Sequence, residues 1–215
     1  TLTHNGYIKR LPVDEFKSQH RGGRGVKGMG VHKDDFIEHL ISSDTHDLML
    51  FFTNSGKVYS MKGYEIPEYG RSAQGIPIIN LLGIDSNEKI SAVINVSHKA
   101  DNDDKYLFFV TKQGTVKRTP VSEFQNIRSN GLKAINLHDD DELIHVAIID
   151  DHQNMIIGTH NGYALSFDSS LVRSMGRAAA GVRGIRLRDQ DFVIGAATLN
   201  EDSNVLVISE LGYGK

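Results

Sequence analysis

The 215-residue sequence contains no cysteine and no tryptophan. Without cysteine the chain has neither a disulfide framework nor a thiolate metal site, and such a composition suits a reducing cytosol. No apolar stretch approaches eighteen residues, and the first ten residues lack the apolar core of a signal peptide. We therefore expect a cytoplasmic protein without a signal peptide, a membrane span or a membrane partner.

Motifs of common catalytic sites are also missing. The sequence has no G-x-S-x-G and no P-loop, and its ten histidines fit no H-E-x-x-H or other metal-binding spacing. The acidic run at 139–142 could in principle hold a cation, but its weaker recurrence in the other repeats favours a solvated turn. We predict no catalytic residue, no metal site and no cofactor in this chain.

What the sequence does contain is an internal repeat. Short apolar runs end at a glycine about every fifty residues, and a second glycine follows 17 to 19 residues later. The anchoring glycines are Gly6, Gly56, Gly114, Gly162 and Gly212. An acidic turn and a further apolar run complete each unit. The repeats are roughly 1–46, 47–105, 106–153 and 154–203, with a partial unit at 204–215.

Each unit has the pattern of four short strands. The runs are rich in Val, Ile, Phe and Tyr, and the first two strands meet at a turn whose glycine supplies a positive φ. No segment keeps a 3.6-residue apolar period, so long helices are not expected. We predict one all-β domain over 1–215, a propeller-like incomplete ring of four-stranded blades, with stacked small sandwiches as the alternative fold.

The segment QHRGGRGVKGMG at 19–30 has three possible interpretations. Residues 23–28 spell G-x-G-x-x-G, but a dinucleotide turn needs a parallel strand before it and a helix after it, which an all-β repeat does not supply. A solvated glycine-rich turn and a phosphate-binding loop remain. The phosphate interpretation gains from the bare backbone N–H groups of the glycines and from the forked donors of Arg21 and Arg24.

Charge sorts by position within the repeats, although the net charge is only −3. Basic residues gather at 9–27, 112–133 and 163–188, acidic ones at 101–104, 139–142 and 189–202, and the second repeat is the weakest. If the units are arranged radially, the basic positions form a band. The basic segments show no RNA-recognition signature and no aromatic series, which favours the backbone of duplex DNA as the ligand.

The segment QHRGGRG, preceded by THNGYIKRLPV and followed by VKGM, resembles the C-terminal domain of DNA gyrase A. The family's box reads Gln-Arg-Arg-Gly-Gly-(Lys/Arg)-Gly, and His20 departs from it at the second position, which removes a permanent positive charge. Later segments such as VRSMGRAAAGVRGIRLRD and ELGYGK extend the resemblance over essentially the whole chain. The related domain of topoisomerase IV looks similar in the repeats but lacks an intact box, so the box favours gyrase.

The resemblance implies a fold and a role. The family's domain is a six-bladed β-pinwheel whose neighbouring blades exchange strands, and DNA wraps around its basic perimeter so that strand passage introduces negative supercoils. The box lies in the first blade and is needed for wrapping. The partners implied are double-stranded DNA, the rest of gyrase A, and gyrase B in a heterotetramer, in a bacterial cytoplasm at the nucleoid. The catalytic tyrosine and the ATPase of this topoisomerase lie outside such a domain.

Together the charge pattern and the resemblance predict a set of DNA-contacting residues. The set is Lys9, Arg10, Gln19, Arg21, Gly22, Gly23, Arg24, Gly25, Lys27, Arg71, Lys117, Arg118, Arg128, Lys133, Arg177, Arg183 and Arg186.

Three other functions stay open at this point: the C-terminal domain of a topoisomerase IV-like protein, a propeller that binds an acidic peptide on the same surface, and a propeller hydrolase. The hydrolase would need carboxylates that line a central channel, whereas the acids here cluster in turns.

Overall fold

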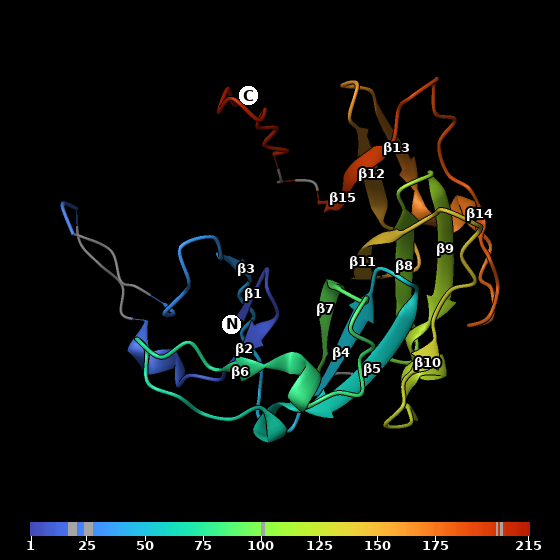
Figure 1. The fold of residues 1–215 in the computed structure, drawn as a ribbon. Coiled ribbons are helices and arrows are strands. Elements are labelled where there is room, and N and C mark those ends of the chain that lie inside the picture. The colour runs from blue at the N-terminus through green and yellow to red at the C-terminus, as the bar shows by residue number, and fades with distance from the viewer. Residues whose placement is uncertain (17–20, 24–27, 100–101, 201, 203) are drawn as a thin grey trace. The chain divides into compact units, whose positions relative to one another are not determined.

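The computed structural model describes residues 1–16, 21–23, 28–99, 102–200, 202 and 204–215. These residues form four antiparallel sheets, and the only helices among them are 3-10 turns of three or four residues (Figure 1). The predicted all-β fold of blade-like sheets is therefore confirmed. The chain divides into two compact units, one of residues 1–102 with 124–134 and one of 103–123 with 135–215.

The first unit contains two four-stranded sheets. In one, the strand order is β3-β1-β2-β6, with β1 (Leu2–Thr3), β2 (Tyr7–Ile8), β3 (Ile37–His39) and β6 (Ile76–Pro77). In the other it is β10-β5-β4-β7, with β4 (Leu48–Thr53), β5 (Lys57–Lys62), β7 (Ile90–Val96) and β10 (Leu132–Lys133). The 3-10 turns η1 (Val13–Glu15), η2 (Gly63–Glu65) and η3 (Ile78–Asn80) connect these strands.

The second unit contains a four-stranded and a three-stranded sheet. The order β11-β8-β9-β14 comprises β8 (Tyr106–Thr111), β9 (Thr115–Pro120), β11 (Leu143–Ile149) and β14 (Val182–Arg183). The order β13-β12-β15 comprises β12 (Asn154–Thr159), β13 (Ala164–Asp168) and β15 (Val193–Leu199). The short turns η4 (Val121–Phe124) and η5 (Ser169–Leu171) follow β9 and β13.

Three of the sheets borrow their last strand from the next repeat. Strand β6 belongs to the second repeat but pairs with β2 of the first, in the register Ile8↔Ile76. In the same way β10 pairs with β5 and β14 pairs with β9. The structure thus shows the strand exchange that the resemblance implied, and each borrowed strand lies at the edge of its sheet.

The hairpins close at the glycines that define the repeat. Gly6, Gly56, Gly114 and Gly162 have φ between +79° and +82°, where a side chain is unfavourable and glycine is not. This confirms the predicted turn geometry.

Each unit has its own apolar core, to which the continuous apolar runs of β4 and β8 contribute. In the first unit Met49, Phe51 and Met61 belong to the buried cluster. In the second unit Phe108, Val110 and Ile157 belong to the corresponding cluster. Met49 and Phe51 stand two residues apart on β4 and Met61 pairs with Met49, so these three side chains lie on one face of their sheet.

Candidate nucleic-acid interface

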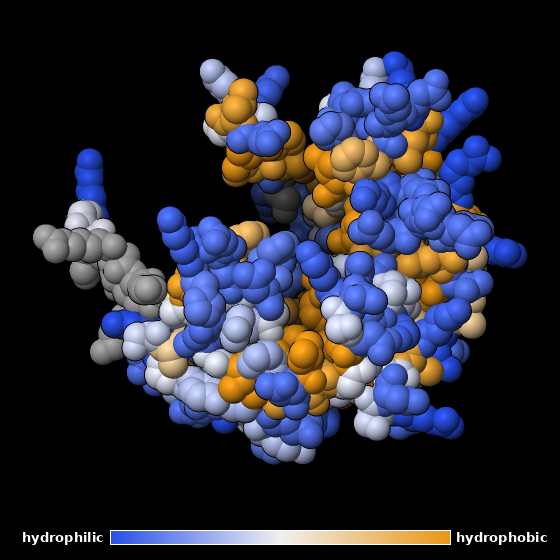
Figure 2. Space-filling model, viewed as in Figure 1, coloured by the Kyte–Doolittle hydropathy of each residue, from blue (hydrophilic) through white to orange (hydrophobic). Residues whose placement is uncertain are grey.

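The borrowed edge strands and the loops that lead into them carry most of the predicted basic residues that are exposed. Arg71 and Arg128 lie in the loops before β6 and β10, and both are exposed. Lys133 lies on β10 and Arg183 on β14, both exposed, and Arg186 follows three residues after Arg183. Figure 2 shows strongly hydrophilic side chains that project beside β14, at the right of the view. In each of these three sheets, the predicted basic residues named here lie on the borrowed edge strand or in the chain next to it.

A glycine with positive φ ends each arginine loop and begins the edge strand. Gly75, Gly131 and Gly181 have φ of +83°, +75° and +99°. At Gly75 the backbone also passes very close to strand β2, because a Cβ atom there would lie 2.3 Å from the carbonyl oxygen of Ile8. The loop can therefore turn into the edge strand only where the residue has no side chain.

The part of the Gln19–Gly25 box that the structure describes is open to solvent. Arg21, Gly22 and Gly23 are exposed, and Gly22 has φ +86° with no heavy atom within 4 Å of the position of a Cβ. The predicted contacts Gln19, Arg24, Gly25 and Lys27 lie outside the described residues.

Lys9 and Lys117 require a correction. They were predicted to contact phosphates, but Lys9 is 1% exposed and Lys117 is 0% exposed. The Lys9 ammonium donates hydrogen bonds to the backbone oxygens of Gly70, Arg71 and Ala73 at 3.0, 2.7 and 2.9 Å. Charge-assisted bonds to carbonyls satisfy a buried ammonium, which a phosphate cannot reach here.

Arg118 is also corrected, while Arg10 and Arg177 are partly engaged. Arg118 is 7% exposed, donates to the backbone oxygen and carboxylate of Asp151, and stacks on the ring of Tyr106 at 4.3 Å. Arg10 donates to the Glu68 carboxylate at 2.7 Å and is half-buried. Arg177 is half-buried too, and its guanidinium donates to the backbone oxygen of Glu123.

Burial sets the proton affinity of Lys117. It lowers the pKa of the Lys117 ammonium to about 8, and repulsion from Arg177 adds to the shift. Burial likewise lowers the pKa of Lys9. Between pH 8 and about 10.4, the Lys117 side chain is mostly neutral in the folded chain and still mostly protonated in the unfolded chain. Because the unfolded chain binds more protons in this interval, the Lys117 side chain makes the free energy of unfolding increase as pH rises from 8 to about 10.4. This contribution is absent below pH 8.

We expect an NMR titration of lysine side-chain Cε signals to show one lysine that titrates near pH 8, well below the usual value of about 10.4. The signal should be missing from a Lys117→Met variant, which should also lack the rise in unfolding free energy between pH 8 and 10. If every lysine signal of the folded chain titrates above pH 9.5, the burial of Lys117 is disproved.

The acidic turns hold the hairpins closed. The carboxylates of Asp35, Asp141 and Asp191 accept hydrogen bonds at 2.9 to 3.0 Å from the backbone N–H directly before a hairpin glycine. Burial raises the pKa of Asp35, but hydrogen bonds from Thr3, Asn5 and Phe36 outweigh it and leave that pKa below its usual value. In three of the repeats the recurring acid is therefore a turn acceptor.

The acidic run at 139–142 contains one of these turn acceptors. Asp141 accepts from both the Gln113 and the Glu142 backbone N–H groups. Over the described ranges, no group of three or more His, Cys, Asp or Glu side chains is arranged to hold a metal ion.

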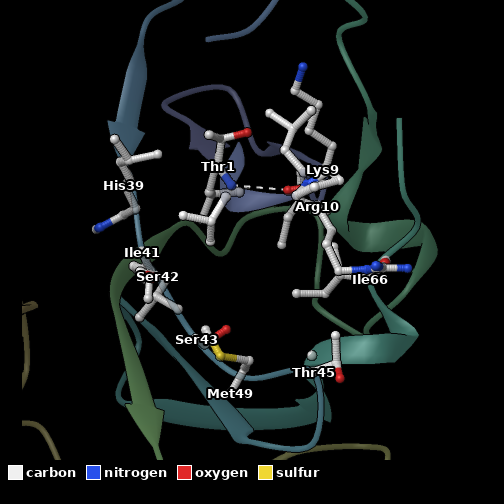
Figure 3. Close-up of a pocket in the computed structure, with 18 of the residues that line it drawn as sticks. Thr1, Lys9, Arg10, His39, Ile41, Ser42, Ser43, Thr45, Met49 and Ile66 are labelled. Atoms are coloured by element: carbon white, nitrogen blue, oxygen red, sulfur yellow. Dashed lines mark hydrogen bonds between the residues drawn. The ribbon is translucent and has the colours of Figure 1, made fainter. Parts of the chain in front are cut away.

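The first unit has a pocket of about 320 Å³ next to β2, shown in Figure 3. Its walls are largely apolar, with Met49, Ile41 and Ile66, and the amino group of Thr1 donates to the Lys9 backbone oxygen at its rim. The described residues that line it include no Asp or Glu. It is not the carboxylate-lined channel that the hydrolase hypothesis requires.

The sequence did not reveal that two lysines and one tyrosine pack against the arginine loops. It assigned Lys9 and Lys117 to DNA although they hold loops, and it did not single out Tyr59, whose ring packs on the loop before β10. A signal was present: all three stand three residues after a hairpin glycine, and one of them is aromatic. The tyrosine at this position of the second repeat indicates that the position faces the interior, where all three residues are buried.

Comparison with known proteins decides the family. The family described as the DNA gyrase C-terminal domain, a beta-propeller, matches residues 1–44, 47–97, 105–150 and 153–200. The chain belongs to this family. The resemblance inferred from the box and the repeats is thereby confirmed.

Individual relatives agree with the family. The DNA gyrase A protein of Streptococcus pneumoniae serotype 4 is 59% identical over 179 residues, which are 83% of this chain and 22% of that protein. The chain thus spans about a fifth of the length of this relative. A solved gyrase A C-terminal domain superposes with a TM-score of 0.78 at 30% identity, and covers 99% of this chain and 68% of its own.

The solved C-terminal domain of DNA topoisomerase IV is similar as well. Its TM-score is 0.79 at 29% identity, over 100% of this chain and 65% of that chain. The fold alone therefore does not separate gyrase from topoisomerase IV. Among the described residues, none of the helices has the length and apolar character that a membrane crossing requires.

Proposed function

We propose that this domain binds and wraps duplex DNA along its basic edge strands, and thereby directs negative supercoiling by a DNA gyrase. The observation that carries the proposal is the shared placement of exposed Arg71, Arg128, Lys133, Arg183 and Arg186 on, or next to, the borrowed edge strands of three sheets. Guanidinium groups match phosphate geometry, and contacts to phosphates alone carry no sequence preference.

Wrapping needs contributions from several sheets at once. Bending a few tens of base pairs costs on the order of 10 kcal/mol, so a single arginine cannot hold DNA in a bent form. Repetition of the same basic edge in successive repeats supplies contacts at intervals along the duplex. We expect binding that tolerates sequence and prefers DNA that bends easily.

The gyrase assignment has more support than topoisomerase IV. The curated relatives at 54 to 59% identity are gyrase A proteins, and residues 19–25 keep the box except at His20. On this basis we propose that the remainder of gyrase A, together with gyrase B, forms its partners, and that the catalytic tyrosine and the ATPase lie in those parts.

A binding titration across salt concentrations tests the proposal. With Arg21 and the five edge residues as phosphate contacts, the logarithm of the association constant for a random duplex of about forty base pairs should fall against log salt with a slope of about −5. In a nicked plasmid that is sealed in the presence of the domain, wrapping should also shift the linking number.

The two readouts separate the alternatives. A steep salt slope without a linking-number shift means binding without wrapping and contradicts the wrapping part. Binding of an acidic peptide that heparin and DNA do not displace would instead establish the protein-interaction alternative.

A further inference from the structure

The residue three positions after the hairpin glycine contacts the arginine loop of the following repeat. This position is occupied by Lys9, Tyr59 and Lys117 in the first three repeats, and all three side chains are at most 1% exposed. The loops they contact are 70–75, 128–131 and 176–181, each of which carries one of the predicted arginines. We call these three residues the anchor residues.

Lys9 is surrounded by the backbone of loop 70–75. Its three ammonium hydrogens have three acceptors, the carbonyl oxygens of Gly70, Arg71 and Ala73. The Ala73 N–H closes the same turn by donating to the Gly70 oxygen at 3.0 Å. The Arg71 carbonyl thus points to the buried ammonium, while the Arg71 residue itself is exposed.

Lys117 repeats this arrangement in the second unit. Its ammonium donates to the carbonyl oxygen of Arg177, the counterpart of Arg71, and lies 5.2 Å from the centre of the Phe109 ring. The Ala179 N–H donates to the Gly176 oxygen at 3.1 Å, so this turn is closed in the same way. In both repeats a buried lysine therefore donates to the backbone oxygen of the loop arginine.

Tyr59 serves a shorter loop. Arg128 stands three residues before Gly131, whereas Arg71 and Arg177 stand four before their glycines. The Tyr59 ring fills the space, since a Cβ on Gly131 would lie 2.6 Å from it, and the Tyr59 hydroxyl donates to Glu88 at 3.0 Å. The type of anchor residue and the length of the loop therefore change together.

The anchored loop also holds the preceding repeat. The Gly30 N–H donates to the Ala73 oxygen at 3.2 Å, and a Cβ on Gly30 would lie 2.4 Å from the Ser72 oxygen. The Asn136 N–H donates to the Ala179 oxygen at the equivalent place. Gly30 stands five residues after the end of the box, so the loop that Lys9 organises is also the support of the chain that leaves the box.

We propose that Lys9 and Lys117 are positioning residues for DNA binding, which act through the arginine loop of the next repeat and do not touch DNA. The inference rests on the proposed function and assigns these two lysines a role within it. An ordered loop presents its arginine without an ordering cost at the moment of binding. Charge-assisted bonds to loop carbonyls supply that order, from Lys9 to three oxygens and from Lys117 to the Arg177 oxygen. An exposed lysine of equal charge has no such effect.

A double-mutant cycle on the 215-residue chain tests the proposal. Lys9→Met and Arg71→Ala should each weaken binding to the forty-base-pair duplex about fivefold at 0.15 M salt, and the double variant should bind like Arg71→Ala alone. In Lys9→Met the amides of Ala73 and Gly30 should exchange hydrogen faster. Lys99→Met, which removes an exposed lysine paired with Asp44, is the charge-matched control and should leave both amides unchanged.

Each outcome decides a separate point. Unchanged exchange at Ala73 and Gly30 overturns the anchoring, and additive losses in the cycle mean that Lys9 acts on DNA independently of Arg71. If the unsubstituted chain binds no duplex, the proposed function fails, while the exchange measurement still decides whether Lys9 orders the loop. If Lys9→Met does not fold, the same cycle with Lys117→Met and Arg183→Ala, on the edge strand that follows loop 176–181, makes the test in the other compact unit.

Discussion

Replacing Arg71, Arg128, Arg183 and Arg186 together by alanine is expected to lower the affinity for duplex DNA about 600-fold at 0.15 M salt, because each lost phosphate contact removes a factor of about five. The slope of log affinity against log salt should become shallower by about 4. The fold should be kept, since all four side chains are exposed. Fluorescence anisotropy with a labelled duplex at several salt concentrations measures both quantities.

The matched control removes the same charge elsewhere. Lys89, Lys99, Lys105 and Lys112 flank β7 and β8 in the chain and lie outside the borrowed strands and their arginine loops, and the last three pair with carboxylates. Changing these four to alanine should lower the affinity far less and leave the salt slope nearly unchanged. Equal losses in the two variants would show that net charge alone attracts DNA, and would contradict an edge-specific interface.

The second large effect is on stability. Gly75→Ala should lower the free energy of unfolding by about 3 kcal/mol, because a side chain at positive φ costs about 1–2 kcal/mol and overpacking adds about 1–3 kcal/mol. The new Cβ would lie 2.3 Å from the Ile8 oxygen, against rigid backbone, and would force β6 away from β2. Urea denaturation followed by circular dichroism gives the change.

Gly6→Ala separates the two contributions to this loss. Gly6 lies in the same compact unit at nearly the same φ, +81°, but a Cβ there would meet only the Ile78 side chain at 3.5 Å, an ordinary contact. Its cost should be that of the backbone conformation, about 1–2 kcal/mol. If the two variants are equally stable, the close approach of the Gly75 backbone to β2 contributes nothing.

Much of the fold could be predicted from the sequence, because its causes are local. The hairpin glycines need positive φ and the strands are short apolar runs rich in β-branched and aromatic residues, and both signals lie within a few residues. The strand exchange could not be derived in this way. Strand β10 has only the two residues Leu132 and Lys133, and its pairing with β5 depends on chain segments more than seventy residues apart.

The sequence indicated the exposure of the basic residues in part, and their contact with DNA stays a prediction. Charge and position correctly indicated exposed basic residues such as Arg71 and Arg183, since an arginine in a turn before a strand is normally solvated. Lys9 and Lys117 were misplaced because charge was taken as a sign of exposure. A lysine is buried when several acceptors converge on its ammonium, and here those acceptors are carbonyl oxygens of a loop about sixty residues further on, which carry no signature in the sequence.

The borrowed strands have a mechanical consequence if the domain wraps DNA as proposed. A bent duplex stores elastic energy and pulls on whatever retains it. Tension applied through Arg71 passes by covalent bonds into the second repeat and, through the β6–β2 ladder and the Lys9 ammonium, into the first. The force is shared by two repeats wherever one repeat pairs a strand with the sheet of another. Detaching such a strand would break its hydrogen bonds to the first repeat and pull on the chain of the second.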